Sequence, residues 1–375
     1  MKKTILTIIL AIALCAMLVA CQAAPAESSA PASEAPAATS EAPASTEAPA
    51  SSEAAMPDPP VSIANGEYTI GFSNASVSNP WRVVFTDTLN YVAENNPNVT
   101  LYTTDANEDA QKQLADCEDL ISKDIDALVV SPAVTGALAP VIDMCKEKGI
   151  PLVVVDRDIG AEGYDAFVRT DGHILGEAIA DSVNNYFNGT AKVVYISGIA
   201  GSGPDNERNE GFYDQLKKYP GIEVLATQAA DWDPTKSLTV MENLLQGYPE
   251  MQGVVCTDGT TAVGAWQAIQ AANRTDIVLF NMDNTRNDSL QMTLDGIIVD
   301  TSVENAIYCG AWAMNVAIDL LNGKTLKSPE VMIPTPFITK DNAAQFMDPS
   351  LAATDYPWKG LYKDSMETAY PEIWN

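Results

Sequence analysis

The chain of 375 residues carries 50 Asp and Glu residues against 21 Lys and Arg, which gives a formal net charge of −29 at pH 7. A protein this acidic is repelled by the phosphates of nucleic acids and by anionic membrane surfaces, which argues against both as partners. The single histidine, His173, has no cysteine near it in the sequence, so histidine-based metal or triad chemistry is not expected.

The first twenty residues have the pattern of an export signal. Two lysines precede an apolar run over residues 4–19, which is too short to span a bilayer comfortably. The run ends in Leu18-Val19-Ala20-Cys21, which resembles the lipobox of bacterial lipoproteins. The resemblance implies that residues 1–20 are a lipoprotein signal peptide and that Cys21 is lipidated after cleavage. An ordinary signal peptide and an uncleaved anchor remain as alternatives.

The next segment is compositionally biased. Residues 22–60 contain no Lys, Arg or aromatic residue and are dominated by Ala, Pro, Ser and Glu. Such a segment buries too little apolar surface to offset its ordering entropy, so we predict a disordered tether over residues 21–60. About 315 residues follow, from Val61 to Asn375, a length that suits two lobes better than one small core.

This body alternates short apolar runs with helical patterns. In its first half we predict strands at Tyr68–Phe72, Val99–Tyr102, Ala127–Val130 and Leu152–Val155. The first three strands are followed by helices that begin near Asn79, Asn107 and Thr135, with Asn79 and Asn107 as N-caps. After Asp171 we predict strands at Val193–Ile196, Ile222–Leu225, Val254–Cys256, Ile277–Phe280 and Ile297–Val299. The later helices begin near Asp205, Pro234, Thr260 and Asn284, and a last one runs from about Glu304 to Asn322.

Strands separated by helices of this length predict an α/β fold with parallel sheets made of right-handed βαβ units. Two such series predict two doubly wound lobes. Ligands of open α/β sheets bind beyond the carboxyl ends of the strands. The residues that follow the predicted strands there are Asn79, Trp81, Arg82, Asp156, Arg157, Asp258, Asp283 and Glu304, with Trp232 as a second aromatic. Aromatic rings, carboxylates and guanidiniums together suit a polyol, because rings contact its C–H faces and charged groups bond its hydroxyls.

Several segments then carry a resemblance to a known family: Gly71–Arg82, Val153–Arg157, Glu207–Phe212, Ala230–Asp233 and Met282-Asp283. In this order they resemble the ribose-type periplasmic sugar-binding proteins, the type I solute receptors of ABC importers, which have the LacI-like fold. The resemblance implies two lobes that are joined by a three-strand hinge and close on the sugar. The implied crossings lie near residues 170–171, 304–305 and 334–336. They assign residues 61–170 plus 305–335 to the N-terminal lobe and 171–304 plus 336–375 to the C-terminal lobe.

The resemblance also implies roles for the N-terminal lobe's candidates. Asn79 matches an asparagine that hydrogen-bonds the sugar, and Trp81 takes the place of a stacking aromatic. Arg82 follows Trp81 as in galactofuranose-type receptors, where it would bind hydroxyls. Asp156 and Arg157 match the Asp-Arg pair that grips vicinal hydroxyls. A core position for Trp81, a surface position for Arg82 and a structural Asp156–Arg157 ion pair are the alternatives.

In the second lobe, the resemblance makes Arg208 a ligand-binding arginine, Trp232 the aromatic on the opposite face and Asp283 the base of the cleft. Asp258 replaces a usual asparagine and Glu304 a usual glutamine, which leaves the exact sugar open. Arg208 has Asp205 and Glu207 as alternative partners, and Trp232 also suits packing under its loop. Helix capping or a hinge hydrogen bond would equally explain the carboxylates Asp258, Asp283 and Glu304.

Three other patterns are weaker. Asp105–Asp109 alternates oxygen ligands as a calcium loop does, but Ala110 and Asp116 stand where glycine and glutamate are needed. Gly198–Gly203 lacks the order of a nucleotide-binding loop, and a turn that feeds Arg208 explains it better. The body's cysteines have no metal-like spacing and are expected to be small buried hydrophobic residues: Cys117, Cys145, Cys256 and Cys309.

The sequence therefore predicts a non-enzymatic, monomeric receptor without a cofactor or metal. It would be lipid-anchored at the outer face of the bacterial cytoplasmic membrane, or periplasmic, and deliver a monosaccharide to an ABC permease. The ligand would be an aldose, for which the furanose form is one candidate. A sugar sensor without transport and a glycosidase are the alternatives. The aromatic tail, about residues 340–375, extends beyond the ribose-type pattern, and we expect it to pack along the second lobe.

Overall fold

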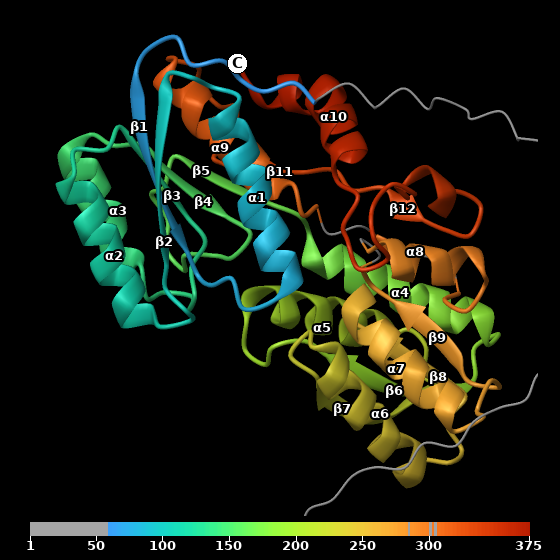
Figure 1. The fold of residues 1–375 in the computed structure, drawn as a ribbon. Helices are drawn as coiled ribbons and strands as arrows, with labels where there is room; N and C mark the ends of the chain where they lie inside the picture. Colours follow the sequence, from blue (N-terminus) through green and yellow to red (C-terminus); the bar gives the residue numbers. More distant parts are fainter. Residues whose placement is uncertain (1–58, 284–285, 300–301, 304–305) are drawn as a thin grey trace, which may run out of the picture. The chain divides into compact units, whose positions relative to one another are not determined.

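The computed structural model describes residues 59–283, 286–299, 302–303 and 306–375, which belong to one structural unit, 55–375 (Figure 1). The predicted signal peptide, Cys21, the greater part of the predicted tether and Glu304 lie outside the described residues. Within the described ranges, no helix is long and apolar enough to cross a membrane.

The first lobe contains a parallel sheet with the strand order β11-β5-β4-β3-β1-β2. Its strands are β1 (Tyr68–Asn74), β2 (Val99–Asp105), β3 (Ala127–Val130), β4 (Leu152–Val155), β5 (Ala166–Arg169) and β11 (Glu330–Met332). The helices packed on it are α1 (Pro80–Glu94), α2 (Ala110–Ser122), α3 (Ala139–Lys148) and α9 (Cys309–Leu321).

The second lobe contains a parallel sheet with the strand order β7-β6-β8-β9. Its strands are β6 (Ala191–Ser197), β7 (Ile222–Ala229), β8 (Gly253–Cys256) and β9 (Val278–Asn281). Its helices are α4 (Gly172–Tyr186), α5 (Gly203–Leu216), α6 (Pro234–Gly247), α7 (Gly259–Ala271) and α8 (Asn287–Leu294). A short antiparallel pair, β10 (Ser302–Val303) with β12 (Phe337–Ile338), joins two distant parts of the chain. The prediction of two parallel-sheet α/β lobes is confirmed.

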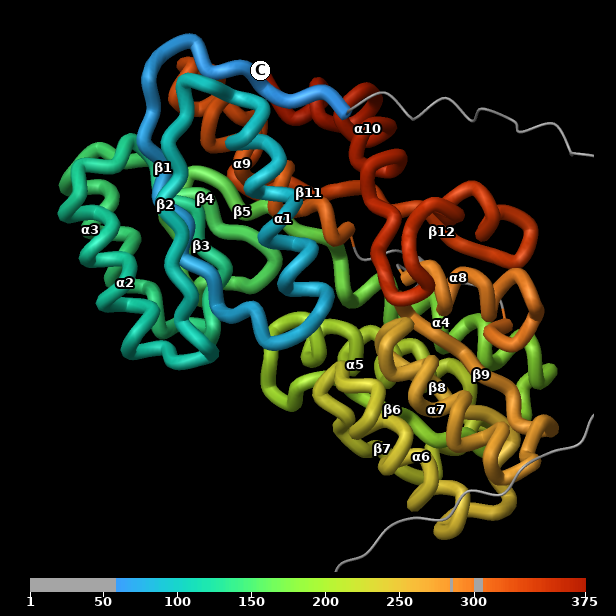
Figure 2. Tube along the Cα trace, in the orientation of Figure 1, coloured from blue at the N-terminus to red at the C-terminus, as the bar shows by residue number. Residues whose placement is uncertain are grey.

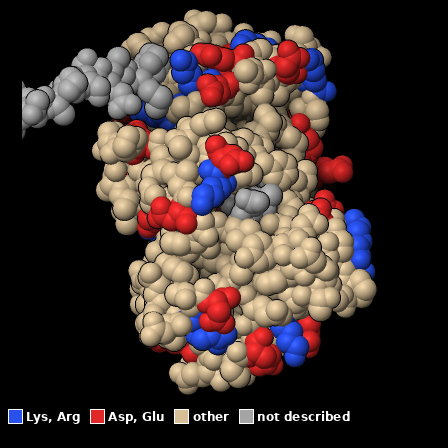
Figure 3. Space-filling model, turned by 90° about the vertical axis from the view of Figure 1, so that its right-hand side faces the viewer, with Lys and Arg blue, Asp and Glu red and all other residues tan. Residues whose placement is uncertain are grey.

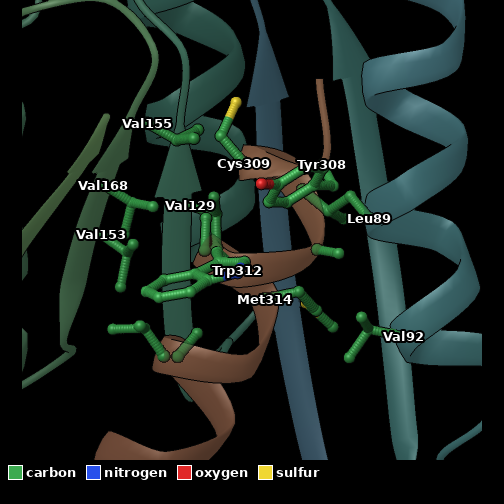
Figure 4. Close-up of a cluster of buried hydrophobic side chains, with 14 of the residues drawn as sticks. Leu89, Val92, Val129, Val153, Val155, Val168, Tyr308, Cys309, Trp312 and Met314 are labelled. Carbon is green, nitrogen blue, oxygen red and sulfur yellow. The ribbon is translucent and has the colours of Figure 1, made fainter. Parts of the chain in front are cut away.

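The inner strands of the first sheet, β1, β3, β4 and β5, are buried on both faces, and alternate strand residues point to opposite sides. Figure 4 shows Trp312 of α9 among valines of the sheet, which include Val129, Val153 and Val168. The residues between these in the strands, such as Leu128 and Val154, pack against α2 and α3 instead. This two-sided burial explains why the strands read as unbroken apolar runs.

In the second lobe, α4 and α5 lie unusually close together. A Cβ on Gly211 would lie 2.0 Å from the carbonyl oxygen of His173, and one on Gly176 would lie 2.3 Å from that of Arg208. Only glycine permits this backbone approach. The contact fixes the turn of α5 that carries Arg208.

Several element boundaries differ from the prediction. The strand β5 and the helix α4 were not predicted. In β5, three apolar residues followed by Arg169 after a glycine-containing loop give a weak strand signal. The helix α2 begins at Ala110 with Asp109 as its N-cap, and Asn107 instead adopts a left-handed φ of 52°. At 297–299, an isolated bridge between Ile298 and Leu279 replaces the expected strand.

The other helix starts also shift along the chain. Helix α3 begins at Ala139 rather than near Thr135, and α9 begins at Cys309 rather than near Glu304. The body's four cysteines are buried and free, as expected of small apolar residues.

The prediction that the C-terminal tail packs along the second lobe is confirmed for its first part only, in which Ala343, Phe346 and Met347 pack with Leu290 of α8. Its helix α10 (Lys359–Thr368) and the 3₁₀ turn at Tyr370–Ile373 instead join the core of the first lobe. Tyr362 is fully buried, and the Trp312 indole donates a hydrogen bond of 2.9 Å to the Ser365 hydroxyl. The tail's aromatic residues therefore cover α9. The domain boundaries stay a prediction.

Charged side chains are dispersed on the face of the molecule drawn in Figure 3. On that face, Lys and Arg side chains lie next to Asp and Glu side chains, and most of the visible surface carries neither. In the described part of the chain, no group of three or more metal-ligating side chains is close enough to hold an ion.

Candidate functional site

A cavity is lined by residues of both lobes. The predicted site residues that line it are Asn79, Trp81, Arg82, Asp156, Arg208, Trp232, Asp258 and Asp283. The structure therefore brings eight of the ten predicted residues together. It adds Thr260 and Tyr356, with two prolines, to the lining.

Asn79 and Trp81 stand at the start of α1, as the sequence predicts. The Asn79 side chain caps the helix and accepts a hydrogen bond of 2.9 Å from the Arg82 backbone N–H. The Trp81 indole stacks on Phe85 at 5.4 Å between centroids, nearly parallel at 9°. Packing thus fixes the ring that lines the cavity. Among the described residues, the buried indole Nε1 of Trp81 has no hydrogen-bond partner.

Arg82 and Asp156 form a buried ion pair in the wall. The Arg82 Nη2 atom lies 2.6 Å from Asp156 Oδ2, and its Nη1 donates to the Ser131 hydroxyl at 2.8 Å. Burial, helped by the charge of Arg157, lowers the pKa of Arg82, which Asp156 opposes. Asp156 adopts a left-handed φ of 65°, a conformation that is costly for a residue other than glycine and is often found at functional sites. Arg82 is 3% exposed, so the surface alternative is wrong.

Arg157 is not among the residues that line the cavity. Its guanidinium donates 2.9 Å to Glu108 Oε2 and 3.2 Å to the Ala133 carbonyl oxygen, and its Nε lies 4.0 Å from Asp156. The carboxylate of Glu108, from the segment with calcium-like spacing, is thus used in an ion pair. Arg157 adjoins Asp156 without lining the cavity, and its predicted contact with the sugar gains no support from this position.

Acidification should weaken the fold through Glu108. Burial opposes ionisation of this carboxyl, but hydrogen bonds from Arg157 and Ser76 outweigh it and hold the pKa of Glu108 below its ordinary 4.5. A pKa lowered by folding contributes stability that is present above the unfolded-state value and is lost as the pH falls through the folded-state value. In urea unfolding, Glu108→Gln should therefore lose less stability than the wild type on acidification from about pH 6 to about pH 3.5.

Glu207 supplies a control of opposite sign. Burial raises the pKa of its carboxyl above 4.5 despite the Arg169 guanidinium, so its contribution is present at low pH and lost as the pH rises. Glu207→Gln should lose more stability than the wild type over the same acidification. Equal pH dependence in all three proteins would contradict both assignments.

In the second lobe, Arg208 is held by residues that follow β8 and β9. Its Nη1 donates to the Thr257 carbonyl oxygen at 2.8 Å, and its Nη2 lies 3.5 Å from Asp283 Oδ2. It does not pair with Asp205, which accepts from the Gly198 N–H at 2.6 Å, or with Glu207, which pairs with Arg169. Among the described residues, the buried Nε of Arg208 has no hydrogen-bond partner, so this lining residue keeps a donor.

Trp232 lies directly against the backbone of the glycine-rich turn. A Cβ on Gly198 would lie 2.1 Å from the Trp232 indole, so this turn requires glycine for packing. Trp232 has a left-handed φ of 56°, and its Nε1 donates to the Thr257 hydroxyl at 3.3 Å. The indole lines the cavity from the second lobe, whereas Trp81 lines it from the first.

Asp258 caps α7, which was one of the alternatives predicted for this carboxylate. Its two carboxylate oxygens accept from the backbone N–H groups of Thr260 and Thr261 at 3.2 and 2.9 Å. Glu304 lies outside the described residues. Thr260 was missed as a lining residue although it lies two residues after Asp258, in the first turn of α7, whereas nothing in the sequence pattern pointed to Tyr356.

Two parallel α/β lobes with a cavity between them define a two-lobed solute-binding protein. The family model described as periplasmic binding protein domain matches residues 70–325, more than half of the chain. The chain therefore belongs to the periplasmic binding protein family, whose members act outside the cytoplasm.

The relatives include sugar and polyol binders. The chain is 31% identical to ribose import binding protein RbsB of Bacillus subtilis, over 70% of this chain and 84% of that protein. It is 29% identical to a xylitol-binding protein of Mycolicibacterium smegmatis, over 65% of this chain and 70% of that protein. An ABC transporter solute-binding protein of Bacillus halodurans with bound myo-inositol superposes with a TM-score of 0.69 at 26% identity, covering 75% of this chain and 97% of that one. These are binding proteins and not enzymes.

Proposed function

We propose that this protein captures a neutral monosaccharide or related polyol between its two lobes and delivers it to the membrane subunits of an ABC importer. The observation that carries the proposal is the cavity, in which each lobe contributes a tryptophan and an Arg–Asp pair. The relatives named for ribose and xylitol support the ligand class.

The chemistry of the lining suits hydroxyls on an apolar ring. The indoles of Trp81 and Trp232 offer flat surfaces to C–H groups. The carboxylates of Asp156 and Asp283 accept hydrogen bonds from hydroxyls, and the Arg208 Nε donates one. Because each lobe supplies part of this set, a bound ligand favours the closed arrangement of the lobes.

The charges of the lining favour a neutral ligand. The lining contains two arginines and three aspartates, a formal sum of 2 − 3 = −1. Both arginines already face a carboxylate, Arg82 at 2.6 Å and Arg208 at 3.5 Å. A sugar acid or sugar phosphate would have to displace one of these pairs, at the cost of leaving a buried aspartate unpaired.

We infer from the lipobox-like Leu18–Cys21 that the protein is anchored by lipid at Cys21. Such an anchor would keep the receptor beside its permease. In cells fed an alkyne fatty acid, the wild type should incorporate the label and sediment with membranes. Cys21→Ala should do neither, and equal labelling of the two proteins would overturn the anchor. The sensor alternative is not favoured, since the curated relative above is an import binding protein.

The test of the proposed function is a thermal-shift screen of the purified protein, followed by calorimetric titration. The panel contains D-ribose, L-arabinose, D-galactose, D-fructose, xylitol and myo-inositol, with D-glucuronate as the charged comparison. A ligand that binds only the folded state raises the melting temperature by mass action. We expect a rise of several degrees for at least one neutral member and none for glucuronate. A flat response after unfolding and refolding, which removes carried-over ligand, would contradict the proposal.

A further inference from the structure

The C-terminal segment after β12, residues 339–375, lies beyond the part of the chain that the family model matches, which ends at residue 325. Figure 2 shows it as the dark red trace that passes from the region of β12 and α8 to α10. It contacts the second lobe first and the first lobe afterwards. The chain therefore crosses from the second lobe to the first once more, after β12.

The second-lobe anchor of this segment is the start of α8. The backbone N–H of Asn287 donates to the Asp355 carbonyl oxygen at 3.0 Å, and that of Asp288 donates to the Ala353 carbonyl oxygen at 2.7 Å. The Asn287 side chain adds a bond of 2.8 Å to the Asp348 carbonyl oxygen. These bonds use N–H groups that a helix start leaves unpaired, so the segment acts as a cap for α8.

The first-lobe anchor follows directly. The Trp358 ring meets the Tyr91 ring edge to face at 5.4 Å, and the Tyr362 hydroxyl donates to the Pro60 carbonyl oxygen at 3.0 Å. The Asn315 side-chain amide of α9 donates to the same hydroxyl at 2.7 Å. Only Tyr356 and Pro357 separate the two anchors.

Because the connection between the two anchors has only two residues, it restricts where the Tyr356 side chain can lie. Two extended residues span at most about 7 Å, and proline restricts both its own φ and the backbone of the residue before it. Tyr356 is 5% exposed, lines the cavity, and also lines the larger groove outside it together with Asn79 and Pro80. Its ring thus forms part of the wall between the cavity and the outer groove.

The hydroxyl of Tyr356 lies near a second hydroxyl of the cavity lining. It is 3.5 Å from the Thr260 hydroxyl, which belongs to the second lobe and also lines the cavity. Burial raises the pKa of Tyr356, so the phenol is neutral and able to donate. The ionised carboxylates of the cavity only accept hydrogen bonds, whereas these two hydroxyls also donate.

We propose that Tyr356, delivered by the C-terminal crossing, is a ligand-contacting residue that donates a hydrogen bond to a sugar hydroxyl and thereby helps to select the sugar. This inference rests on the proposed function, since it names a further contact in the same cavity. It assigns a binding role to a segment that the sequence left without one.

The test compares two tyrosine-to-phenylalanine variants of the tail by calorimetric titration with the same neutral panel. Tyr356→Phe keeps the ring and removes the hydroxyl, and it should raise the Kd for the panel member that binds wild type best by about 3- to 30-fold. Its melting temperature without ligand should stay close to that of the wild type. Tyr362→Phe is the matched control and should keep the wild-type Kd while melting at a lower temperature.

The selectivity of Tyr356→Phe gives a second measurement. The difference in Kd between the preferred sugar and the other panel members should be smaller for Tyr356→Phe than for the wild type. The reason is that the removed hydroxyl donates to the preferred sugar more than to the others. A wild type that binds and a Tyr356→Phe protein that binds equally well, with the same preference, would overturn this inference alone. A wild type that binds no panel member would overturn the proposed function for these sugars, and this inference with it.

Discussion

Trp232→Ala should weaken binding of the preferred neutral sugar by about 10- to 100-fold, because burying a large apolar side chain against a ligand contributes about 1.5–3 kcal/mol. The indole lines the cavity, and its position depends on contact with Gly198 rather than on the hydrophobic core. The free energy of unfolding without ligand should therefore change little. Calorimetric titration gives the first quantity and urea unfolding the second.

Trp266→Ala is the matched control for this experiment. Trp266 is a half-buried tryptophan of α7 that packs against the core of the same lobe and does not line the cavity. Its removal should lower the free energy of unfolding and leave the Kd unchanged. If Trp232→Ala instead lost stability and kept its affinity, the packing alternative for Trp232 would be correct.

Asp156→Asn should lower the free energy of unfolding by about 2–4 kcal/mol and weaken sugar binding as well. The substitution keeps a residue that tolerates the left-handed φ of 65° but leaves the buried Arg82 guanidinium without its counter-charge. Such a loss is a large share of the 5–15 kcal/mol that typically stabilises a folded protein. Urea unfolding of the protein without ligand measures it.

Two further variants define what the Asp156 result means. Asp276→Asn removes the carboxylate from an exposed ion pair with Arg274 and should cost less than about 1 kcal/mol. Arg82→Met combined with Asp156→Asn should recover part of the lost stability, because no buried charge is left unpaired. The double variant should still bind the sugar more weakly than the wild type. Recovery of binding along with stability would show that the pair serves only the fold.

The strands were the easiest elements to predict. Runs such as Leu152–Val155 are buried on both faces of a parallel sheet, so they appear as continuous apolar segments with helices between them. The short β5 was missed because its four residues give too little pattern. The start of α2 was misplaced by two residues, since both Asn107 and Asp109 suit an N-cap and only the backbone chose between them.

The candidate site was predicted from strand ends and from a family resemblance. The folded structure then shows which of the predicted residues line the cavity. Trp81, Arg82 and Asp156 follow strands whose ends meet at one edge of the first sheet, and all three line the cavity. Arg157 also follows such an end, but its side chain turns to Glu108. Adjacent residues at a strand end point in different directions, so sequence proximity does not establish which of them faces a ligand.

The sequence by itself determined the alternation of strand and helix, the acidic composition and most of the polar residues at the strand ends, because these depend on local pattern and residue type. The tertiary structure alone decided the partners of those residues: Arg82 with Asp156, Arg208 with Asp283, and Arg157 with Glu108. It also decided where the tail lies. Tyr356 reaches the cavity because α8 and α9, distant from it in the chain, hold the segments on either side of it. Contacts between residues so far apart depend on the folded chain as a whole, and no local pattern encodes them.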